Sequence, residues 1–271
     1  MERELKKFKN YVQSDFMTKF ISDMSIDYNN YIKHDTAYGN YFGMHFYPFW
    51  HNSNQEDFTG IIDSYFLEHM VCTMYVHDPD KKYLYTYAGS SSLFLAILIF
   101  GRERERDIMF HSMLALIESN IAKSYSIDYQ STTLQEAFLL YDIYTDGKNH
   151  DLWMPYVTKP LTPLYQECLD KILSDDEGQV KSLLSDMLDY HVKQSNNDNF
   201  VRSEFTYPSQ RVFPTEILAL IHYRHTQGKS IDFIDDEVLS VFVPYIKAGN
   251  FRPSPAVEKA RNDMYGLLDI R

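Results

Sequence analysis

Apolar residues recur at helical spacing along much of this sequence, and this periodicity constrains the fold more than any other feature. A representative stripe comprises Phe58, Ile62, Tyr65, His69, Cys72 and Val76. Residues three or four positions apart share one face of an α-helix, because the helix turns every ~3.6 residues. Similar stripes occupy 5–20 and 180–188. The 10 glycines and 10 prolines leave few residues for the turns of an all-β protein, so the sequence predicts an all-α fold.

Helix-start signals separate these apolar stripes. Three residue pairs fit a capping box, in which the side chain of each residue accepts a hydrogen bond from the backbone N–H of the other. The pairs are Ser53 with Glu56, Thr132 with Gln135, and Ser174 with Glu177. Three prolines follow residues suited to an N-terminal cap or precede an acid, as is typical of a first helical turn. They are Pro163 after Thr162, Pro255 after Ser254, and Pro214 before Glu216.

Length and composition bear on the domain organisation. With 271 residues, 44% of them hydrophobic, the chain can bury a large core, and no linker rich in Pro, Gly or Ser divides it. Gly101 separates an apolar run at 93–100 from 102–118, which predicts two antiparallel helices joined at a tight corner. We therefore expect antiparallel helical hairpins packed into one compact body. This body is a single domain over 1–271, with 1–78 as a candidate N-terminal subdomain.

Two stretches depart from the helical pattern. The first, YGNYFGMHFYPFWH at 38–51, combines many aromatic residues with two glycines and a proline. We expect an ordered loop whose rings cover the core, because burial is the usual fate of aromatic side chains. A loop that stacks on a ligand or a partner is the alternative. The second stretch, 230–234, is where we expect a short strand if the fold contains one.

The net charge of −12 limits the classes of partner. A negative surface repels phosphate backbones and anionic membranes, so we expect neither nucleic acid nor a membrane as a partner, whereas a basic protein would be attracted. Cys72 and Cys168 are too few for a disulfide framework or a cysteine-built zinc site. The longest apolar run, 93–100, is far shorter than the ~20 residues that span a bilayer, and the first ten residues do not resemble a signal peptide. We expect a soluble, cytoplasmic protein.

The stretch EILALIHYRH at 216–225 raises the question of a metal site or a catalytic helix. His222 and His225 are three residues apart with no acid between them, unlike the His-Glu-x-x-His pattern of catalytic zinc helices. We interpret them as core or rim histidines with hydrogen-bonded partners. A helical metal-dependent hydrolase that uses both histidines is the alternative. His69 and Cys72, one turn apart, are likewise interpreted as buried residues, and we predict no catalytic residue, metal or cofactor.

Nine acidic residues form the candidate partner-binding surface. Those at 175–177 and 235–237 lie where helices are expected to start, and acids in a first turn interact favourably with the helix dipole. Because helix starts lie at the ends of hairpins, these carboxylates should be exposed, and they could form an acidic face for a basic partner. The nine residues are Asp175, Asp176, Glu177, Asp186, Asp189, Asp232, Asp235, Asp236 and Glu237.

The carboxy-terminal third resembles helical immunity proteins of bacterial polymorphic-toxin systems. The likeness lies in FPTEILALIHYRHTQGKSIDFIDDEVLSVFVPYI at 213–246: an apolar helix after a proline, a polar turn with glycine, a short Ile-containing segment, an acid, and a helix with a proline. The matching positions are Pro214, Glu216, Ala219, Gly228, Ile231, Asp235 and Pro244. The segment is similar to the family catalogued as immunity protein forty-nine. The PoNi-type immunity proteins share its overall style.

This resemblance implies a protein without enzymatic activity that binds and occludes a cognate toxin in the producing cell. If the toxin is a nuclease, its substrate groove is basic, and an acidic helical surface would complement it. A helical adaptor or scaffold with no toxin partner is a further alternative. The sequence specifies neither the toxin nor an oligomeric state.

Overall fold

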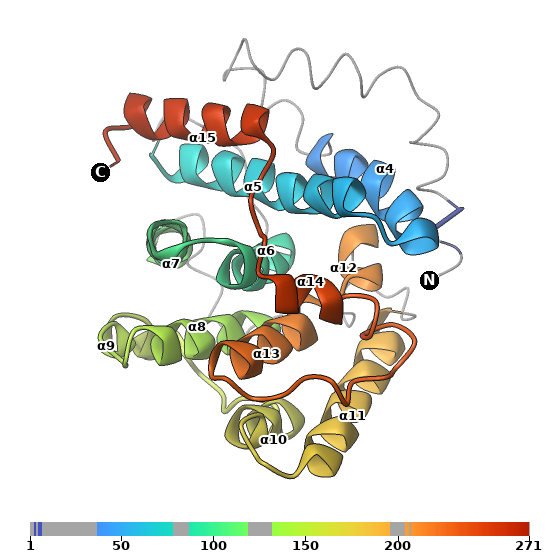
Figure 1. The fold of residues 1–271 in the computed structure, drawn as a ribbon. Coiled ribbons are helices and arrows are strands. Elements are labelled where there is room, and N and C mark those ends of the chain that lie inside the picture. The colour runs from blue at the N-terminus through green and yellow to red at the C-terminus, as the bar shows by residue number, and fades with distance from the viewer. Residues whose placement is uncertain are drawn as a thin grey trace. The chain divides into compact units, whose positions relative to one another are not determined.

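The computed structural model describes residues 3, 5, 6, 37–77, 87–118, 132–195, 204, 205 and 207–270. Within these residues the chain forms helices and turns and no β-strand, which confirms the all-α class (Figure 1). Contacts divide the chain into two compact units. Unit 1 comprises 1–85 and 251–271, and unit 2 comprises 86–250. The domain boundaries expected from the sequence stay a prediction, and the stripe at 5–20 lies outside the described residues except for residues 5 and 6.

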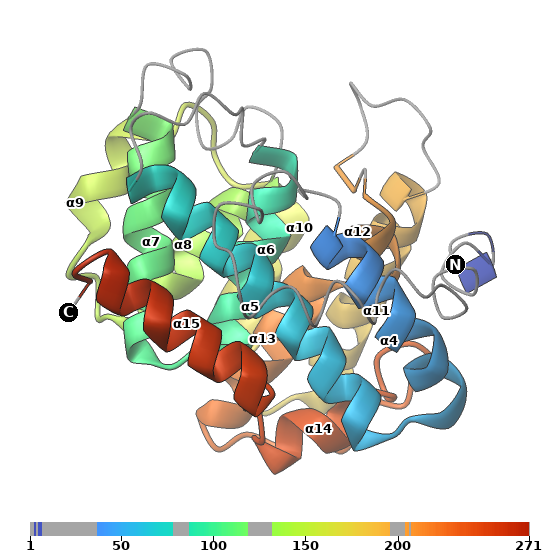
Figure 2. The same ribbon diagram turned by 90° about the horizontal axis from the view of Figure 1, so that it is seen from above.

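Unit 1 is built on α5 (Gln55–His77), which is flanked by α4 (Ala37–Asn52) and α15 (Pro255–Leu267). Figures 1 and 2 show α4 along the N-terminal part of α5 and α15 along its C-terminal part. His69 on α5 and Tyr265 on α15 join these two helices, with His69 Nε2 lying 2.9 Å from the tyrosine hydroxyl. Among the described helices, none is long and apolar enough to cross a membrane.

The aromatic stretch at 38–51 is helical, so the expected loop is wrong. α4 runs through the whole stretch and places aromatic rings along one buried face. The ring centroids of Phe42 and Phe46 lie 5.1 Å apart, and Phe49 lies 5.4 Å from Phe58 on α5. This burial offsets the helix-weakening effect of two glycines and a proline, because tertiary packing outweighs intrinsic propensity.

At two predicted helix starts, a neighbouring residue caps the helix in place of the predicted serine. Ser53 adopts φ +45°, which turns the chain between α4 and α5, so Asn54 takes the cap position instead. Its Oδ1 accepts a backbone N–H three residues later at 2.8 Å. At the start of α11, Asp176 Oδ1 accepts a backbone N–H at 3.0 Å, whereas the predicted cap Ser174 bonds the N–H of Asp176 itself. Sequence spacing located both helix starts to within two residues but chose the wrong side chain.

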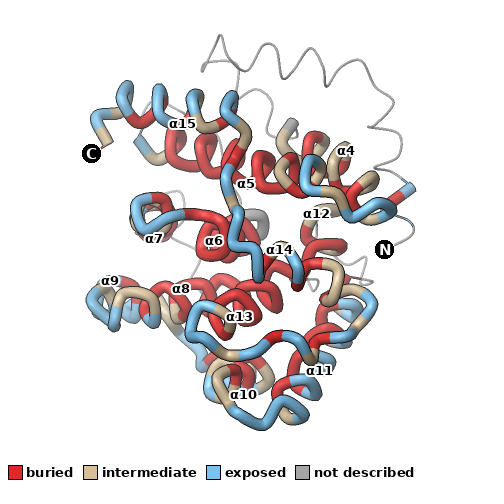
Figure 3. The backbone as a smooth tube through the Cα atoms, in the orientation of Figure 1, coloured by how far each residue is buried: buried red, intermediate tan, exposed pale blue. Residues whose placement is uncertain are grey.

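Unit 2 contains the other described helices, with α6 as their common neighbour. They are α6 (Tyr87–Phe100), α7 (Glu103–Glu118), α8 (Thr132–Tyr144), α9 (His150–Trp153), η3 (Met154–Tyr156), α10 (Pro163–Lys171), α11 (Glu177–Ser195), α12 (Pro208–Val212), α13 (Thr215–Thr226) and α14 (Val243–Ala248). The starts predicted for α8, α10, α13 and, in unit 1, α15 are confirmed. α6 contacts α7, α8 and α13, and every residue of 91–100 is buried, as Figure 3 shows by colour. The apolar run at 93–100 therefore lies in the core of unit 2.

Gly101 lies between α6 and α7, as predicted. A Cβ atom there would lie 2.7 Å from the Ile97 carbonyl oxygen and 3.1 Å from Glu105 Cβ. Both distances are shorter than ordinary van der Waals contacts, so the corner requires glycine.

The chain between α13 and α14 consists of turns. Gly228 adopts φ +74° just after α13 and forms the polar turn with glycine that the sequence indicates at this point. The strand considered for 230–234 does not form, and this stretch makes a turn instead. The helix start expected at 235–237 is also wrong, because α14 begins at Val243. Asp236 Oδ1 instead closes a turn by accepting two backbone N–H groups, at 2.8 and 3.2 Å.

Candidate functional site

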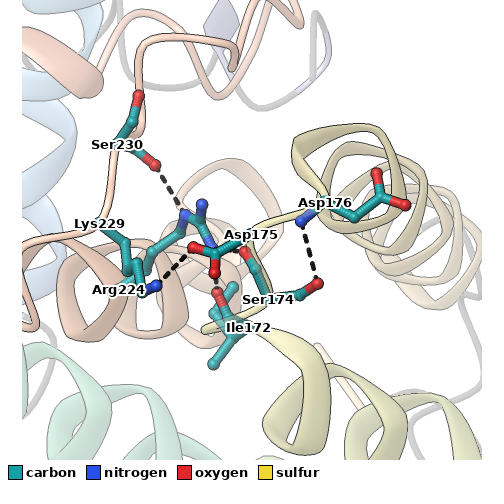
Figure 4. A network of polar contacts seen from close by, with 7 residues as sticks. All are labelled: Ile172, Ser174, Asp175, Asp176, Arg224, Lys229 and Ser230. Atoms are coloured by element: carbon teal, nitrogen blue, oxygen red, sulfur yellow. Dashed lines mark hydrogen bonds and ion pairs between the residues drawn. The ribbon is translucent and has the colours of Figure 1, made fainter.

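Arg224, near the end of α13, is the centre of a polar network that joins two segments far apart in the sequence (Figure 4). The residue is only 2% exposed. Its Nε donates to the Ser230 carbonyl at 2.7 Å, and its Nη1 donates to the carbonyls of Ile172 and Ser174 at 2.6 and 2.8 Å. These carbonyls offset the cost of taking a guanidinium out of water. The network holds the chain that follows α10 against the chain that follows α13.

Two lysine–aspartate pairs connect the same segments at the surface. Lys229 Nζ lies 2.6 Å from Asp175 Oδ1, as Figure 4 shows. Lys181 Nζ on α11 lies 2.7 Å from the Asp235 carboxylate. The first pair includes a residue of the acidic cluster before α11, and the second includes a residue of the cluster after α13. The structure therefore brings the two predicted acidic clusters to adjoining positions.

The nine predicted acids divide into three groups according to their contacts. Three pair with lysines: Asp175 with Lys229, Asp232 with Lys247, and Asp235 with Lys181. Two cap backbone N–H groups: Asp176 and Asp236. Four are exposed and form no ion pair within the part of the chain that the structure describes: Glu177, Asp186, Asp189 and Glu237. These last four are termed the unpaired acids.

The lysine pairs weaken the negative field of this surface. The hydrogen bond from Lys229 holds the pKa of Asp175 below its usual value, and the hydrogen bond from Lys181 does the same for Asp235. All four side chains face water, so these pairs contribute little to stability. Their effect is mainly to cancel charge, because each carboxylate lies beside an ammonium group. The unpaired acids are thus the residues whose negative charge is least neutralised.

His222 is a buried core histidine with a hydrogen-bonded partner, as predicted. Its Nδ1 lies 3.1 Å from the Tyr144 hydroxyl, and the Arg106 guanidinium lies 4.6 Å from the centroid of the Tyr144 ring. Burial, with smaller contributions from Arg106 and His225, lowers the pKa of His222 to about 3. A neighbouring guanidinium would also repel a metal cation. Over the described ranges, no three His, Cys, Asp or Glu residues are arranged to hold a metal ion.

His69 and Cys72 are buried within unit 1, as predicted. The hydroxyl of Tyr265 is the partner of His69 Nε2. Burial, together with the charge of Arg261, lowers the pKa of His69 to about 3. The imidazole is therefore neutral at physiological pH.

The sequence did not predict a cluster of buried ionisable groups in unit 2. It consists of Glu136 on α8, His191 on α11, Glu204, and Glu216 on α13, and is termed the buried carboxylate cluster. Their exposed fractions are 0%, 3%, 9% and 1%. His191 Nδ1 lies 2.6 Å from Glu216 Oε1. Glu204 accepts hydrogen bonds from the backbone N–H of Thr133 at 2.9 Å and from the Tyr190 hydroxyl at 3.0 Å.

Burial changes the protonation of this cluster. It raises the pKa of Glu204 to about 7, despite the opposing hydrogen bonds from Thr133 and Tyr190. Burial also raises the pKa of Glu136 well above its usual value, and the charges of Glu216 and Glu204 add to this effect. For His191, burial opposes the charged form, but the attraction of Glu216 outweighs it and raises the pKa.

Two features of the sequence point to this cluster in retrospect. Glu136 and Glu216 each precede a run of apolar residues, in QEAFLL and TEILALI. Glu216 also suits the first turn of α13, and that explanation accounts for it without burial. His191 and Glu204 carry no local signal, because only the tertiary fold brings them to the two glutamates.

The sequence matches no protein-family model and no curated protein, and the fold matches no solved structure.

Proposed function

We propose that this protein is an immunity protein that binds and neutralises a cognate bacterial toxin in the cytoplasm of the producing cell. The observation that carries the proposal is that lysine pairs bring the two acidic clusters to adjoining positions, on segments that the buried Arg224 holds together. The net charge of −12 and the resemblance of 213–246 to helical immunity proteins support it further. The partner is a basic protein, and a nuclease with a basic substrate groove fits this chemistry best.

The Arg224 network suits a binding surface because it holds two surface segments in fixed positions. A surface that is ordered before binding loses less conformational entropy when its partner arrives. The unpaired acids then attract a basic partner over long range, which raises the association rate more than the final affinity. Occlusion of the toxin follows from the bulk of the helical body.

Two other functions lead to different outcomes in the same experiments. A helical adaptor or scaffold would bind a basic partner through this surface without protecting cells from a toxin. A metal-dependent hydrolase would require ligands beside His222, where the structure instead places Tyr144 and the Arg106 guanidinium. No geometric observation favours the hydrolase.

Protection in cells tests the proposal directly. The proposal places a toxin gene immediately upstream of the gene for this chain, and the product of that upstream gene is expressed in a sensitive bacterium with and without this chain. We expect growth arrest by the toxin alone, and restored growth together with a purified one-to-one complex when both are expressed. A toxin that remains lethal and forms no complex with this chain would overturn the immunity proposal.

The first prediction concerns the unpaired acids. Replacing Asp186, Asp189 and Glu237 with lysine should slow association with the basic partner at least ~tenfold at low salt, because these side chains supply long-range attraction. The difference should shrink towards 1 M salt, where the Debye length falls to ~3 Å. Stopped-flow association rates over a salt series measure this effect.

A matched control uses three acids elsewhere on unit 2. Glu103, Glu118 and Asp151 are exposed and lie on α7 and α9, on the other side of unit 2 from α11 (Figures 1 and 2). Their replacement by lysine changes the net charge equally. Equal slowing by both triple variants would attribute the effect to net charge and remove the case for a local surface. Melting temperatures are compared for both triples, since Glu103 and Asp151 of the control lie in first turns, where an acid contributes ~0.3–1 kcal/mol to its helix.

A further inference from the structure

The buried carboxylate cluster contains more negative groups than the surrounding protein can neutralise. Three glutamates and one histidine meet in an interior where an isolated carboxylate is costly. Neither oxygen of Glu136 has a hydrogen-bond partner among the described residues, and neither does Oε2 of Glu216. Within the described part of the chain, no hydrogen-bond donor stabilises the ionised form of Glu136. Protonation removes the charge at that position.

The neighbouring elements supply few positive charges. Tyr165 and Cys168 face the cluster from α10, and burial raises the pKa of both groups, which keeps them neutral. From α11, Tyr190 contributes only its hydroxyl beside His191. From α12, Arg211 accepts a contact from His191 through its backbone carbonyl, while its Nε donates to the Phe205 carbonyl. Among the described residues, His191 is the basic group held closest to a carboxylate of the cluster.

We propose that the buried carboxylate cluster is a proton-sharing switch, which stabilises unit 2 when protonated and loosens it as rising pH removes protons. Glu204 is the residue whose side chain loses its proton and leaves the cluster. It is the most exposed of the three glutamates, so it reaches water with the least disruption. Its release breaks the hydrogen bonds to Thr133 on α8 and Tyr190 on α11, which join these two helices.

The sign of the effect follows from the direction of the pKa shifts. Glu136, Glu204 and His191 all have raised pKa values in the folded state. A group with a raised folded pKa contributes stability below its unfolded pKa and loses that contribution as the pH rises through the folded value. For Glu204 this window runs from 4.5 to about 7. The buried carboxylate cluster therefore contributes more stability to unit 2 in mild acid than at weakly alkaline pH.

Urea unfolding of the full chain between about pH 5 and about pH 8 tests the switch. We expect the unfolding equilibrium constant to rise with pH by up to about tenfold per unit for each proton released. Glu204→Gln should flatten this dependence, because the amide is always neutral and still offers an acceptor to Thr133. The exposed residue Glu237, changed to Gln, is the matched control and should keep the wild-type slope. A Glu204→Gln profile as steep as the wild type above about pH 6.5, where His69 and His222 no longer titrate, would overturn the proposal.

Infrared spectroscopy gives a second measurement that does not depend on the folding of Glu204→Gln. A protonated buried carboxyl has a C=O stretch distinct from that of a carboxylate. We expect this band in the wild-type chain in mild acid, weaker at alkaline pH, and reduced at both in Glu136→Gln. Absence of the band from the wild-type chain would show that the glutamates are ionised, and the switch would be wrong.

Discussion

At the residue scale, one buried guanidinium connects the segments that carry the acidic clusters. Replacing Arg224 with methionine removes a donor from three carbonyls, those of Ile172, Ser174 and Ser230. Each buried acceptor left without a partner costs ~1–3 kcal/mol, so we expect a loss of about 3 kcal/mol in the free energy of unfolding, allowing for some hydration. Urea denaturation measures this loss.

The matched variant at this position is Arg224→Lys. Lysine keeps the charge but lacks the planar arrangement of donors, so it should recover only part of the lost stability. If Arg224→Met loses less than ~0.5 kcal/mol, a typical surface effect, the network does not hold the two segments together.

At the scale of single elements, α4 depends on a glycine of its neighbour α5. A Cβ atom on Gly60 would lie 2.1 Å from the ring of His45, inside the space that the ring occupies. Gly60→Ala should therefore destabilise unit 1 by ~1–3 kcal/mol, because the ring or the helix must move. Gly39 lies in α4 with nothing within 4 Å of its Cβ position.

Gly39→Ala is thus the matched control for the packing of α4. It should stabilise the helix by ~0.5–1 kcal/mol, since alanine has the higher helix propensity. Thermal melts of both variants provide the measurement. The melting temperatures of the two variants should shift in opposite directions, and the two shifts need not be equal in size. A Gly60→Ala variant as stable as the wild type would show that α4 does not pack on α5 as described.

At the scale of the whole molecule, the protein contains buried groups with opposite pH dependence, because His69 in unit 1 and His222 in unit 2 both have lowered pKa values, whereas that of Glu204 is raised. His69 in unit 1 has a pKa lowered from 6.5 to about 3. Its contribution to the free energy of unfolding is complete above about pH 6.5 and is lost as the pH falls towards 3, because burial favours the neutral imidazole. We expect acid to raise the unfolding constant by up to about tenfold per pH unit through this residue alone, and His69→Gln to remove that dependence.

A double variant tests whether the two effects are independent. His69→Gln should change the pH profile between about pH 3 and pH 6.5, and Glu204→Gln should change it between pH 4.5 and about pH 7, with opposite sign. Because the residues lie in different units, their effects on the free energy of unfolding should add within ~0.5 kcal/mol. A larger deviation at any pH would mean that the two groups influence one another.

The local pattern of the sequence determined the helical class and the apolar run that α6 buries. It also determined the glycines at two turns, Gly101 after α6 and Gly228 after α13. Helical periodicity and the need for a glycine in a tight turn depend on residues close together in the sequence, so both can be recognised without knowing the fold. The same local reasoning assigned 38–51 to a loop, because it weighed glycine and proline but not the α5 surface that buries the rings. It also placed a helix start at 235–237, where Asp236 closes a turn.

The tertiary structure alone decided which charged groups act together. Asp175 and Lys229, or His191 and Glu216, are far apart in the sequence, and no periodicity connects them. Once folding brings such residues together, the lower dielectric and the fixed distances decide which acids are neutralised, which cap a backbone and which are held protonated. The acids themselves are plain in the sequence, but their charge state depends on neighbours that only the fold supplies.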